Sequence, residues 1–461
     1  MSNMQLDLSD IQGNLLRGYR LPFARYIFLR FTQADAARAF LGGVAPLITN
    51  AEIWDEGKPE NTLNIAISAS GLQALELPIE TLNTFPPEFI EGMARRSEIL
   101  GDRNASAPDK WEPMWSERID AWMSINALSP AAREAGYKRV TDLIEKTKGA
   151  VVVGTQDAGV LFVNGKPAPV EHFGYADGFA QPDFVGGQAV DTPGDGKMAK
   201  HGKWDEIQTG EFILGYRNEA DELPPSPKPW ILAKNGSFMV YRKLEQDVKA
   251  FRSYVEDWGK RYSGGPEKLM AKMVGRWRDG TPLALSPDKM DKSIVSDPQR
   301  VNNFTYGDDP EGAKCPLGSH IRRANPRDSL GFEGRLATRR RIARRGLPYG
   351  SYVPEGEPVD DQERGIIFMA LNASISRQFE FVQQQWINYG NDFALGEEAD
   401  PVIGGNHGKG RFVIPGDARR SEEPFICSKL PSFVTVRGGG YFFLPGLTAL
   451  RFLAAGNIDP R

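Results

Sequence analysis

Residues 61–75, NTLNIAISASGLQAL, decide the fold class because their hydrophobic pattern changes part-way along. The first half alternates apolar and polar side chains, as a half-buried β-strand does, and the second half predicts a turn of helix. Residues 25–32, RYIFLRFT, show the same β-like pattern. They lead into residues 33–43, QADAARAFLGG, where we expect a short helix that Gly42 and Gly43 end. The repeating unit is therefore a strand that feeds a helix.

A third unit has a clear helix start. Residues 120–128, DAWMSINAL, predict a strand. Ser129 follows as an N-cap and Pro130 stands at the first helical position, so we expect a helix that runs to about Lys148. Residues 150–156, AVVVGTQ, then predict the next strand.

The second half of the chain repeats this design after a proline-rich segment at residues 218–230, NEADELPPSPKPW, which we interpret as a linker. The two halves therefore indicate two copies of one α+β design. Residues 79–118 and 260–315 are rich in Gly, Pro, Asp and Trp, and we expect functional or covering loops there. Three further runs of a strand into a helix are expected at residues 236–258, 364–388 and 438–456.

Composition limits the function classes. The 461 residues carry a net charge of -4, so there is no basic excess to neutralise the phosphates of a nucleic acid. The two cysteines, Cys315 and Cys427, are far apart, which argues against a disulfide framework or a structural zinc site. No apolar run approaches the length of a membrane span, and the first residues lack the pattern of a signal peptide. We expect a cytoplasmic protein with neither nucleic acid nor membrane as a partner.

Histidine is scarce in this chain, so each one is a candidate ligand. His201 and His407 lie in polar loop sequences, where we expect solvated side chains. His172 opens the stretch HFGYADGFAQP at residues 172–182, which is too rich in glycine and aromatics for an ordinary helix face. His320 follows a Cys-Pro pair in CPLGSHIRRANPRD and precedes several arginines.

These motifs together resemble the dye-decolourising (DyP-type) haem peroxidase family. FGYADG is similar to the family's GxxDG signature, GSHIRRANPR to its proximal histidine segment and RRGLPYG to its distal arginine segment. GxxDG alone is a weak signal, but an ordered set that covers nearly the whole chain is a strong one. The other matching segments are DIQGNLLRGY (10–19), ILGDRN (99–104), GSFMVYRKLEQD (236–247), MVGRWRDGTPL (273–283), DPVIGG (400–405) and GGGYFFLPGL (438–447).

The resemblance implies an α+β fold with two ferredoxin-like domains, each with an antiparallel sheet. We expect an N-terminal domain at residues 1–225, with the GxxDG loop near its end, and a C-terminal domain at residues 226–461 that binds most of the haem. The implied enzyme holds one haem b, reduces hydrogen peroxide and oxidises dyes, phenols or other one-electron donors through a ferryl intermediate. Two other functions stay open: haem binding or delivery with incidental peroxidase activity, and a non-haem protein that binds an anionic ligand.

The resemblance assigns the proton transfer to Asp177, which would act on hydrogen peroxide above the haem. The flanking glycines would let the backbone approach the haem face. Without the resemblance, a turn aspartate is the ordinary interpretation of an Asp-Gly pair. Arg344 matches the family's distal arginine and would stabilise the charge on the departing oxygen. The neighbouring arginines, Arg339, Arg340, Arg341 and Arg345, are expected on a basic face or against the haem carboxylates.

His320 is implied as the axial ligand of the haem iron. A carboxylate hydrogen-bonded to its other ring nitrogen would make the imidazole more basic. Asp400 matches the family position, and Asp392 in YGNDF is the alternative. His172 is left as a structural neighbour.

The remaining candidates concern the walls of the site. Ile366 and Phe368 would project the same way from one strand and line the distal side, which ordinary core residues would also do. Arg242 and Arg322 are candidates for pairing with haem propionates, and surface ion pairs are the alternative for both. Tyr349 is the candidate surface relay of electrons from substrates too bulky to reach the haem.

Overall fold

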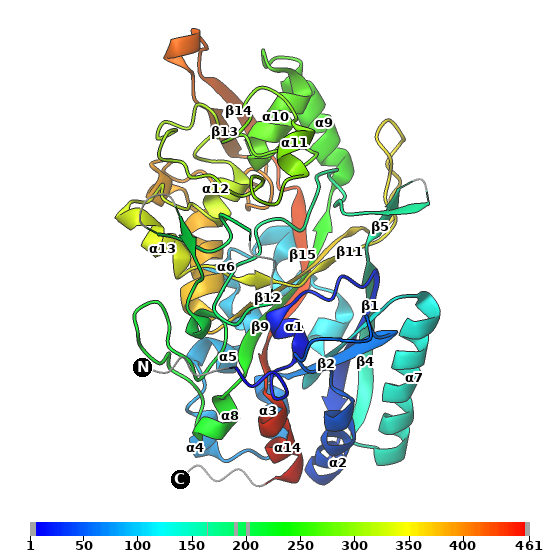
Figure 1. Ribbon diagram of the computed structural model, residues 1–461. Coiled ribbons are helices and arrows are strands. Elements are labelled where there is room, and N and C mark those ends of the chain that lie inside the picture. Colours follow the sequence, from blue (N-terminus) through cyan, green and yellow to red (C-terminus); the bar gives the residue numbers. More distant parts are fainter. Residues whose placement is uncertain (1–5, 164, 189–191, 200–202, 457–461) are drawn as a thin grey trace.

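One antiparallel sheet runs through the computed structural model, which describes residues 6–163, 165–188, 192–199 and 203–456 (Figure 1). Within these residues the sheet has nine strands. In spatial order they are β10 (Ala343–Arg344), β12 (Gly365–Asn372), β9 (Ser237–Gln246), β15 (Val434–Leu444), β2 (Asn61–Ile67), β3 (Ala121–Ala127), β1 (Phe23–Phe31) and β4 (Ala150–Gly159), with β11 (Leu347–Tyr349) also beside β12. Short hairpins add β5 (Leu161–Val163) with β6 (Lys166–Ala168), β7 (Lys197–Met198) with β8 (Trp204–Asp205), and β13 (Gly410–Ile414) with β14 (Phe425–Leu430).

The sheet consists of two half-sheets, one from each half of the chain. Strands β2, β3, β1 and β4 all precede residue 160, and strands β9, β10, β12 and β15 all follow residue 236. A single residue pair, Phe443 with Ile67, joins β15 to β2 across the seam. The fold is therefore α+β with two ferredoxin-like halves, as expected. A domain border between residues 225 and 226 falls between the half-sheets and stays a proposal.

Helices cover the sheet and the site. Among the described residues, none of these helices is long and apolar enough to cross a membrane. They are α1 (Gly13–Leu16), α2 (Ala34–Val44), α3 (Ala69–Ala74), α4 (Ile79–Leu82), α5 (Pro87–Glu91), α6 (Ser97–Leu100), α7 (Pro130–Thr147), α8 (Trp230–Ala233), α9 (Val248–Gly259), α10 (Gly265–Val274), α11 (Lys292–Val295), α12 (His320–Ala324), α13 (Arg335–Thr338) and α14 (Leu447–Ala455), with π-helical turns at Ser376–Glu380 and Val382–Ile387.

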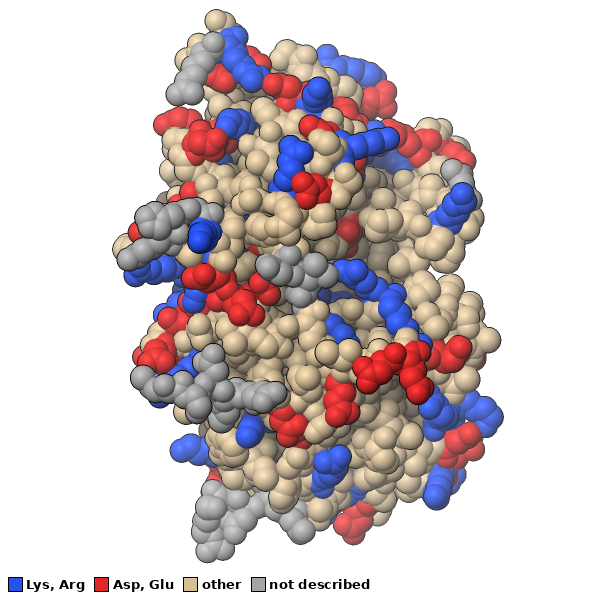
Figure 2. All heavy atoms as spheres, in the orientation of Figure 1, with Lys and Arg blue, Asp and Glu red and all other residues tan. Residues whose placement is uncertain are grey.

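The two faces of the sheet bury separate cores. Alternate residues of β1 point to opposite faces, so Ile27 and Leu29 join the core under α2 and α14, whereas Tyr26 and Phe28 join the other core. On the outside, basic and acidic side chains are interspersed over the face that Figure 2 shows.

The predicted elements are largely present, with three differences. Ser129 caps α7 as expected, because its Oγ accepts a hydrogen bond from the Ala132 N–H at 3.1 Å. Gly42 and Gly43 do not end α2, which continues to Val44. The predicted loop at residues 260–315 contains the helix α10, and the one at residues 79–118 contains several short helices.

Candidate active site

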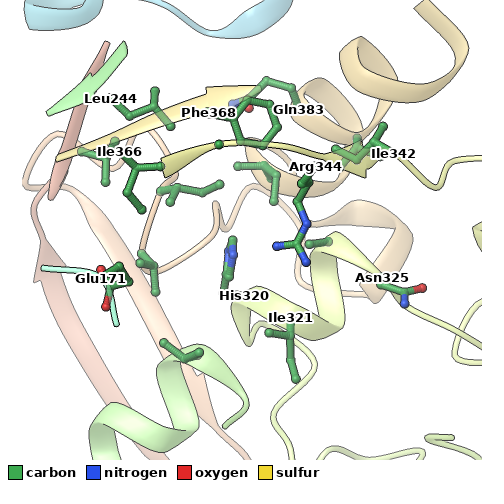
Figure 3. Close-up of a pocket in the computed structure, with 18 of the residues that line it drawn as sticks. Glu171, Leu244, His320, Ile321, Asn325, Ile342, Arg344, Ile366, Phe368 and Gln383 are labelled. Carbon is green, nitrogen blue, oxygen red and sulfur yellow. The ribbon is translucent and has the colours of Figure 1, made fainter. Parts of the chain in front are cut away.

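A cavity of about 430 Å³ lies beside β12 and α12. This is the size of an ordinary small-molecule or cofactor site. Figure 3 shows His320 and Arg344 directed into the same space, with Ile366 and Phe368 on the strand above them. Both halves of the chain supply lining residues, among them residues 100–102 from the first half and residues 402–403 from the second.

The orientation of the His320 ring is fixed by Asp400. His320 is the first residue of α12, and its Nδ1 lies 2.9 Å from the Asp400 Oδ2. Asp400 is fully buried, and its Oδ1 accepts hydrogen bonds from the Val402 and Ile403 N–H groups at 2.8 and 2.9 Å. A carboxylate partner makes Nδ1 the donor, so Nε2 is the nitrogen available to a ligand in the cavity.

The pKa values of His320 and Asp400 shift in the directions expected for two side chains that are hydrogen-bonded to each other. Burial acts to lower the pKa of His320, but the charge and hydrogen bond of Asp400 outweigh it and raise the pKa. Burial acts to raise the pKa of Asp400, and His320 outweighs it in turn and lowers the pKa. Asp392, the alternative partner, instead accepts a hydrogen bond from the Trp386 indole at 3.0 Å.

Asp177 stands at the open end of a small hairpin. Its N–H donates to the Pro169 carbonyl at 2.9 Å, and its Oδ1 accepts from the Gly178 N–H at 2.6 Å. Gly174 and Gly178 have φ values of +96° and +93°, which residues with a Cβ rarely adopt. The side chain of Asp177 is exposed and belongs to the cavity lining.

Arg344 is tied to the loop that continues from Asp177. It lies in β10, its Nη2 donates to the Phe179 carbonyl at 2.5 Å, and its N–H donates to the Gln181 Oε1 at 3.0 Å. The next residue, Arg345, does not line the cavity, and its guanidinium donates to the Asn14 carbonyl at 2.6 Å. Asp177, Arg344 and His320 are thus brought to one cavity from segments far apart in the chain.

Comparison with known proteins points to one family. A model of the DyP dimeric alpha+beta barrel domain matches residues 10–154. The dye-decolorizing peroxidase AauDyP1 of Auricularia auricula-judae is 31% identical over 481 aligned residues, which cover 96% of this chain and 86% of that relative. The chain belongs to the dye-decolorizing peroxidase family. It is a haem peroxidase, and its cofactor is haem b.

Solved structures agree over nearly the full length of this dye-decolorizing peroxidase. An ancestral D-type dye-decolorizing peroxidase gives a TM-score of 0.83 at 29% identity, covering 97% of this chain and 99% of the other. A dye-decolorizing peroxidase in complex with 2,6-dimethoxyphenol gives a TM-score of 0.81 at 27% identity, covering 97% and 100%.

The residues of the cavity fit haem b. Three arginines on its wall, Arg276, Arg327 and Arg341, are buried, and none has an ion-pair partner among the described residues. Burial lowers the pKa of Arg276 and of Arg341 to about 10. All three donate to backbone carbonyls, and the buried Asp195 is one nearby opposite charge. Three guanidinium groups around one carboxylate leave this wall positive, which suits the two propionates of haem. The apolar side chains elsewhere on the wall suit the porphyrin ring.

The predicted propionate partners lie differently. Arg242 lines the cavity, but it forms an ion pair with the buried Asp102. Arg322 is not among the lining residues, and its Nη1 donates to the Cys315 carbonyl at 2.7 Å and pairs with Asp309 at 3.2 Å. Arg322 is therefore part of the interior scaffold, and the expectation of a surface ion pair for either arginine is also wrong because both are buried.

Ile366 and Phe368 both line the cavity from β12, two residues apart on one face. Tyr349 is only 5% exposed, and the Lys243 ammonium lies 4.8 Å from the centre of its ring. Its assignment as a surface relay is wrong, because packing of β11 against β12 places the ring inside.

The other histidines have separate environments. The Nε2 of His172 lies 2.7 Å from the Tyr349 carbonyl, and His172 is not a lining residue. His407 is exposed, as expected, and lies on the edge of the cavity. His201 lies outside the described residues.

Sequence reasoning missed Arg276, Arg327 and one acid, whereas Arg341 was among the arginines expected on a basic face or against the haem carboxylates. Arg276 belongs to the matching segment MVGRWRDGTPL and Arg327 ends GSHIRRANPR, so both lie in segments that signal the family. Glu171 directly precedes the HFGYADG stretch and lines the cavity. In the sequence, Glu171 is recognisable only as a carboxylate next to a glycine-containing loop, and a surface glutamate would give the same pattern.

Proposed function

We propose that this peroxidase reduces hydrogen peroxide in the cavity between His320, Asp177 and Arg344 and takes electrons from dyes or phenols. The observation that carries the proposal is that an acid and a guanidinium line the same cavity as a histidine whose Nδ1 is held by a buried carboxylate. These groups would serve heterolysis of an O–O bond: a proton carrier, a cation and a basic ligand for the haem iron.

His320 would bind the haem iron through Nε2, and Arg276, Arg327 and Arg341 would hold the propionates. When bound, haem supplies the redox chemistry that passes electrons from the donor to peroxide. Ile366 and Phe368 would exclude water from the reacting face, which strengthens the electrostatic interactions there.

Asp177 would take the proton from one oxygen of hydrogen peroxide and give it to the other. Its carboxylate can do so because the hairpin holds it at the cavity while leaving it exposed there. The guanidinium of Arg344 would stabilise the negative charge on the departing oxygen, and its contacts with Phe179 and Gln181 hold it beside the same loop.

The test is peroxide-driven dye oxidation by Asp177→Asn and Arg344→Leu variants, with Arg339→Leu as control because Arg339 lies outside the cavity lining. We expect a loss of at least about 100-fold in the first two and none in the control, the size that acid–base and oxyanion groups commonly contribute. Full activity in both site variants would refute the proposed roles. Absence of a Soret band after haem reconstitution would refute haem binding itself.

The reducing substrate is proposed to be a dye or a phenol. A similar solved dye-decolorizing peroxidase is in complex with 2,6-dimethoxyphenol, which makes this phenol the first donor to test. We also propose a cytoplasmic location, which the two buried and unpaired thiols, Cys315 and Cys427, support. Fractionation of cells with an antibody against the chain tests the location.

A further inference from the structure

Three backbone pairings join the two strands of the hairpin that carries Asp177. Its outermost pair is the Asp177 N–H with the Pro169 carbonyl, at 2.9 Å. The next is a bridge between Val170 and Ala176. The innermost is the Glu171 N–H with the Tyr175 carbonyl, at 3.0 Å. Residues 172–174 form the tip.

The carboxylate of Glu171 binds this hairpin from the side. Its Oε1 accepts from the Tyr175 N–H at 2.9 Å, and its Oε2 accepts from the Phe173 N–H at 2.9 Å. Oε2 also accepts from the Gln246 side-chain amide at 2.6 Å, which ties the hairpin to β9. Both carboxylate oxygens are therefore in use. A group with only one acceptor oxygen cannot make all three bonds.

The position of Glu171 is unusual for an acid. The residue is 9% exposed and lines the cavity, and it has no ion-pair partner among the described residues. In the view of Figure 3 it lies on the opposite side of His320 from Arg344. Burying a carboxylate without a cation is costly and is tolerated only where hydrogen bonds compensate.

The charges around Glu171 are few. Burial raises its pKa to about 7, the bonds from Gln246, Phe173 and Tyr175 oppose this, and the charge of Asp177 adds to the rise. Glu171 in turn acts on the pKa of His320 and raises it. The acid is thus coupled to the residues of the site.

We propose that Glu171 is a positioning residue for Asp177. Its carboxylate fixes the tip and the returning strand of the hairpin, so that Asp177, two residues beyond Tyr175, is held in the cavity beside Arg344. The inference deepens the proposed function and rests on the role of Asp177 as proton carrier.

Residues 172 and 173 at the tip of the hairpin also contact other parts of the protein, so the tip can fold without Glu171. His172 is bonded to the Tyr349 carbonyl, and the ring of Phe173 stacks on Phe251 with centroids 4.3 Å apart. These contacts hold residues 172 and 173 without Glu171. Of the three bonds to the Glu171 carboxylate, only the one from the Tyr175 N–H acts on the strand that leads to Asp177. The same strand is also held by the Ala176 N–H, which donates to the Arg278 carbonyl at 2.8 Å, and by the Tyr175 hydroxyl, which donates to the Met270 carbonyl at 2.9 Å.

Glu171→Gln is the informative variant. Glutamine offers one acceptor oxygen, and its NH₂ group would face the Tyr175 N–H if that oxygen keeps the bonds to Phe173 and Gln246. The matched control is Glu88→Gln, because Glu88 is a buried glutamate that accepts a backbone hydrogen bond from Ser376 at 3.1 Å but lies outside the cavity lining.

The first measurement is hydrogen exchange of the haem-loaded protein by mass spectrometry. In Glu171→Gln we expect about 10-fold faster exchange in the peptide that covers residues 173–178, because its amides open more often. The Glu88→Gln control keeps the wild-type rate in that peptide. Wild-type exchange in Glu171→Gln would overturn the proposal.

The second measurement is a double-mutant cycle on kcat/KM for hydrogen peroxide. Glu171→Gln should lower it about 10-fold without changing KM for the dye, because a small misplacement of a catalytic group is costly. In the Asp177→Asn background the same substitution should have no further effect. Additive losses would overturn the proposal.

The two hypotheses fail in different ways. If Asp177→Asn keeps full activity, the proposed proton carrier is wrong, whatever Glu171→Gln does. If Asp177→Asn is inactive and Glu171→Gln behaves as the wild type, only the positioning role is wrong. Should Glu171→Gln not fold, Gln246→Leu removes the bond that holds the Glu171 carboxylate against β9. Without this bond the carboxylate is held less firmly against the Tyr175 N–H, so both effects should appear at smaller size; wild-type behaviour would overturn the proposal.

Discussion

At the scale of single residues, the bond between His320 and Asp400 would set how basic the proposed ligand of the haem iron is. Asp400→Asn keeps the shape of the side chain but removes its charge, so the imidazole becomes less basic. We expect a higher haem reduction potential and a loss of about 10- to 100-fold in the rate with peroxide, the usual effect of losing such a partner. Spectroelectrochemical titration and stopped-flow mixing measure the two.

Asp392→Asn is the control for that substitution, because Asp392 contacts the Trp386 indole and lies outside the cavity lining. It should leave the potential and the rate unchanged. Equal shifts in the two variants would contradict the assignment of Asp400.

His172 makes a second residue-scale contribution, to stability rather than chemistry. Its pKa is lowered to about 4, mainly because burial penalises the charged ring; the bond to the Tyr349 carbonyl opposes this and Arg364 adds to it. The unfolded chain binds this proton near pH 6.5. The contribution of His172 to the unfolding free energy is therefore complete above pH 6.5, and about 3 kcal/mol of unfolding free energy is lost as the pH falls to 4.

The pH dependence of the melting temperature between pH 4 and 7 tests this. His172→Gln keeps a donor for the Tyr349 carbonyl but does not titrate, so its melting temperature should fall less on acidification than that of the wild type. The pKa of the exposed His407 is also lowered, by burial and by the charges of Arg103 and Lys409, so His407→Gln should change the curve in the same direction but less than His172→Gln. Parallel curves for the wild type and His172→Gln would contradict the prediction.

At the scale of elements, the helix α2 contains two neighbouring glycines with opposite roles. A Cβ at Gly43 would lie 2.6 Å from the Leu143 Cδ1 of α7, whereas a Cβ at Gly42 has its nearest neighbour, the Ala454 Cβ, at 3.9 Å. A methyl group at Gly43 therefore requires the Leu143 side chain to move, and one at Gly42 does not.

Replacing each glycine by alanine should change the unfolding free energy in opposite directions. Gly42→Ala should stabilise the protein by about 0.5–1 kcal/mol through helix propensity. Gly43→Ala should destabilise it by about 1–3 kcal/mol through overpacking. Melting temperatures that rise in both variants would show that α7 yields to the added methyl group.

This pair also shows what sequence could and could not predict about the elements. The strands and the capped start of α7 follow from local periodicity and from Ser129 and Pro130, so they were predictable. The end of α2 was not, because the contact between Gly43 and Leu143 joins residues 100 positions apart. Likewise the motifs pointed to Asp177, Arg344 and His320, but only packing shows which arginines are left without a carboxylate.

At the scale of the molecule, the strands that line the cavity belong to the second half-sheet, but both halves of the chain supply lining residues. The sheet itself crosses the seam at one residue pair, Phe443 with Ile67. Leu100, Gly101, Asp102 and Ser106 of the first half also line the cavity. Asp102 pairs with Arg242 of β9, and both side chains are almost fully buried. This ion pair therefore joins the halves directly at the site.

Breaking that pair should weaken the whole molecule. Asp102→Ala leaves a buried arginine without a partner, and we expect a loss of about 3–5 kcal/mol in unfolding free energy. Haem affinity should fall as well, because Arg242 is a cavity wall residue. The neighbouring Arg103 forms an exposed pair with Glu98, so Arg103→Ala should change stability by less than about 1 kcal/mol. Denaturant unfolding and haem titration of both variants measure these effects; equal, small losses would show that the halves are held together without the buried pair.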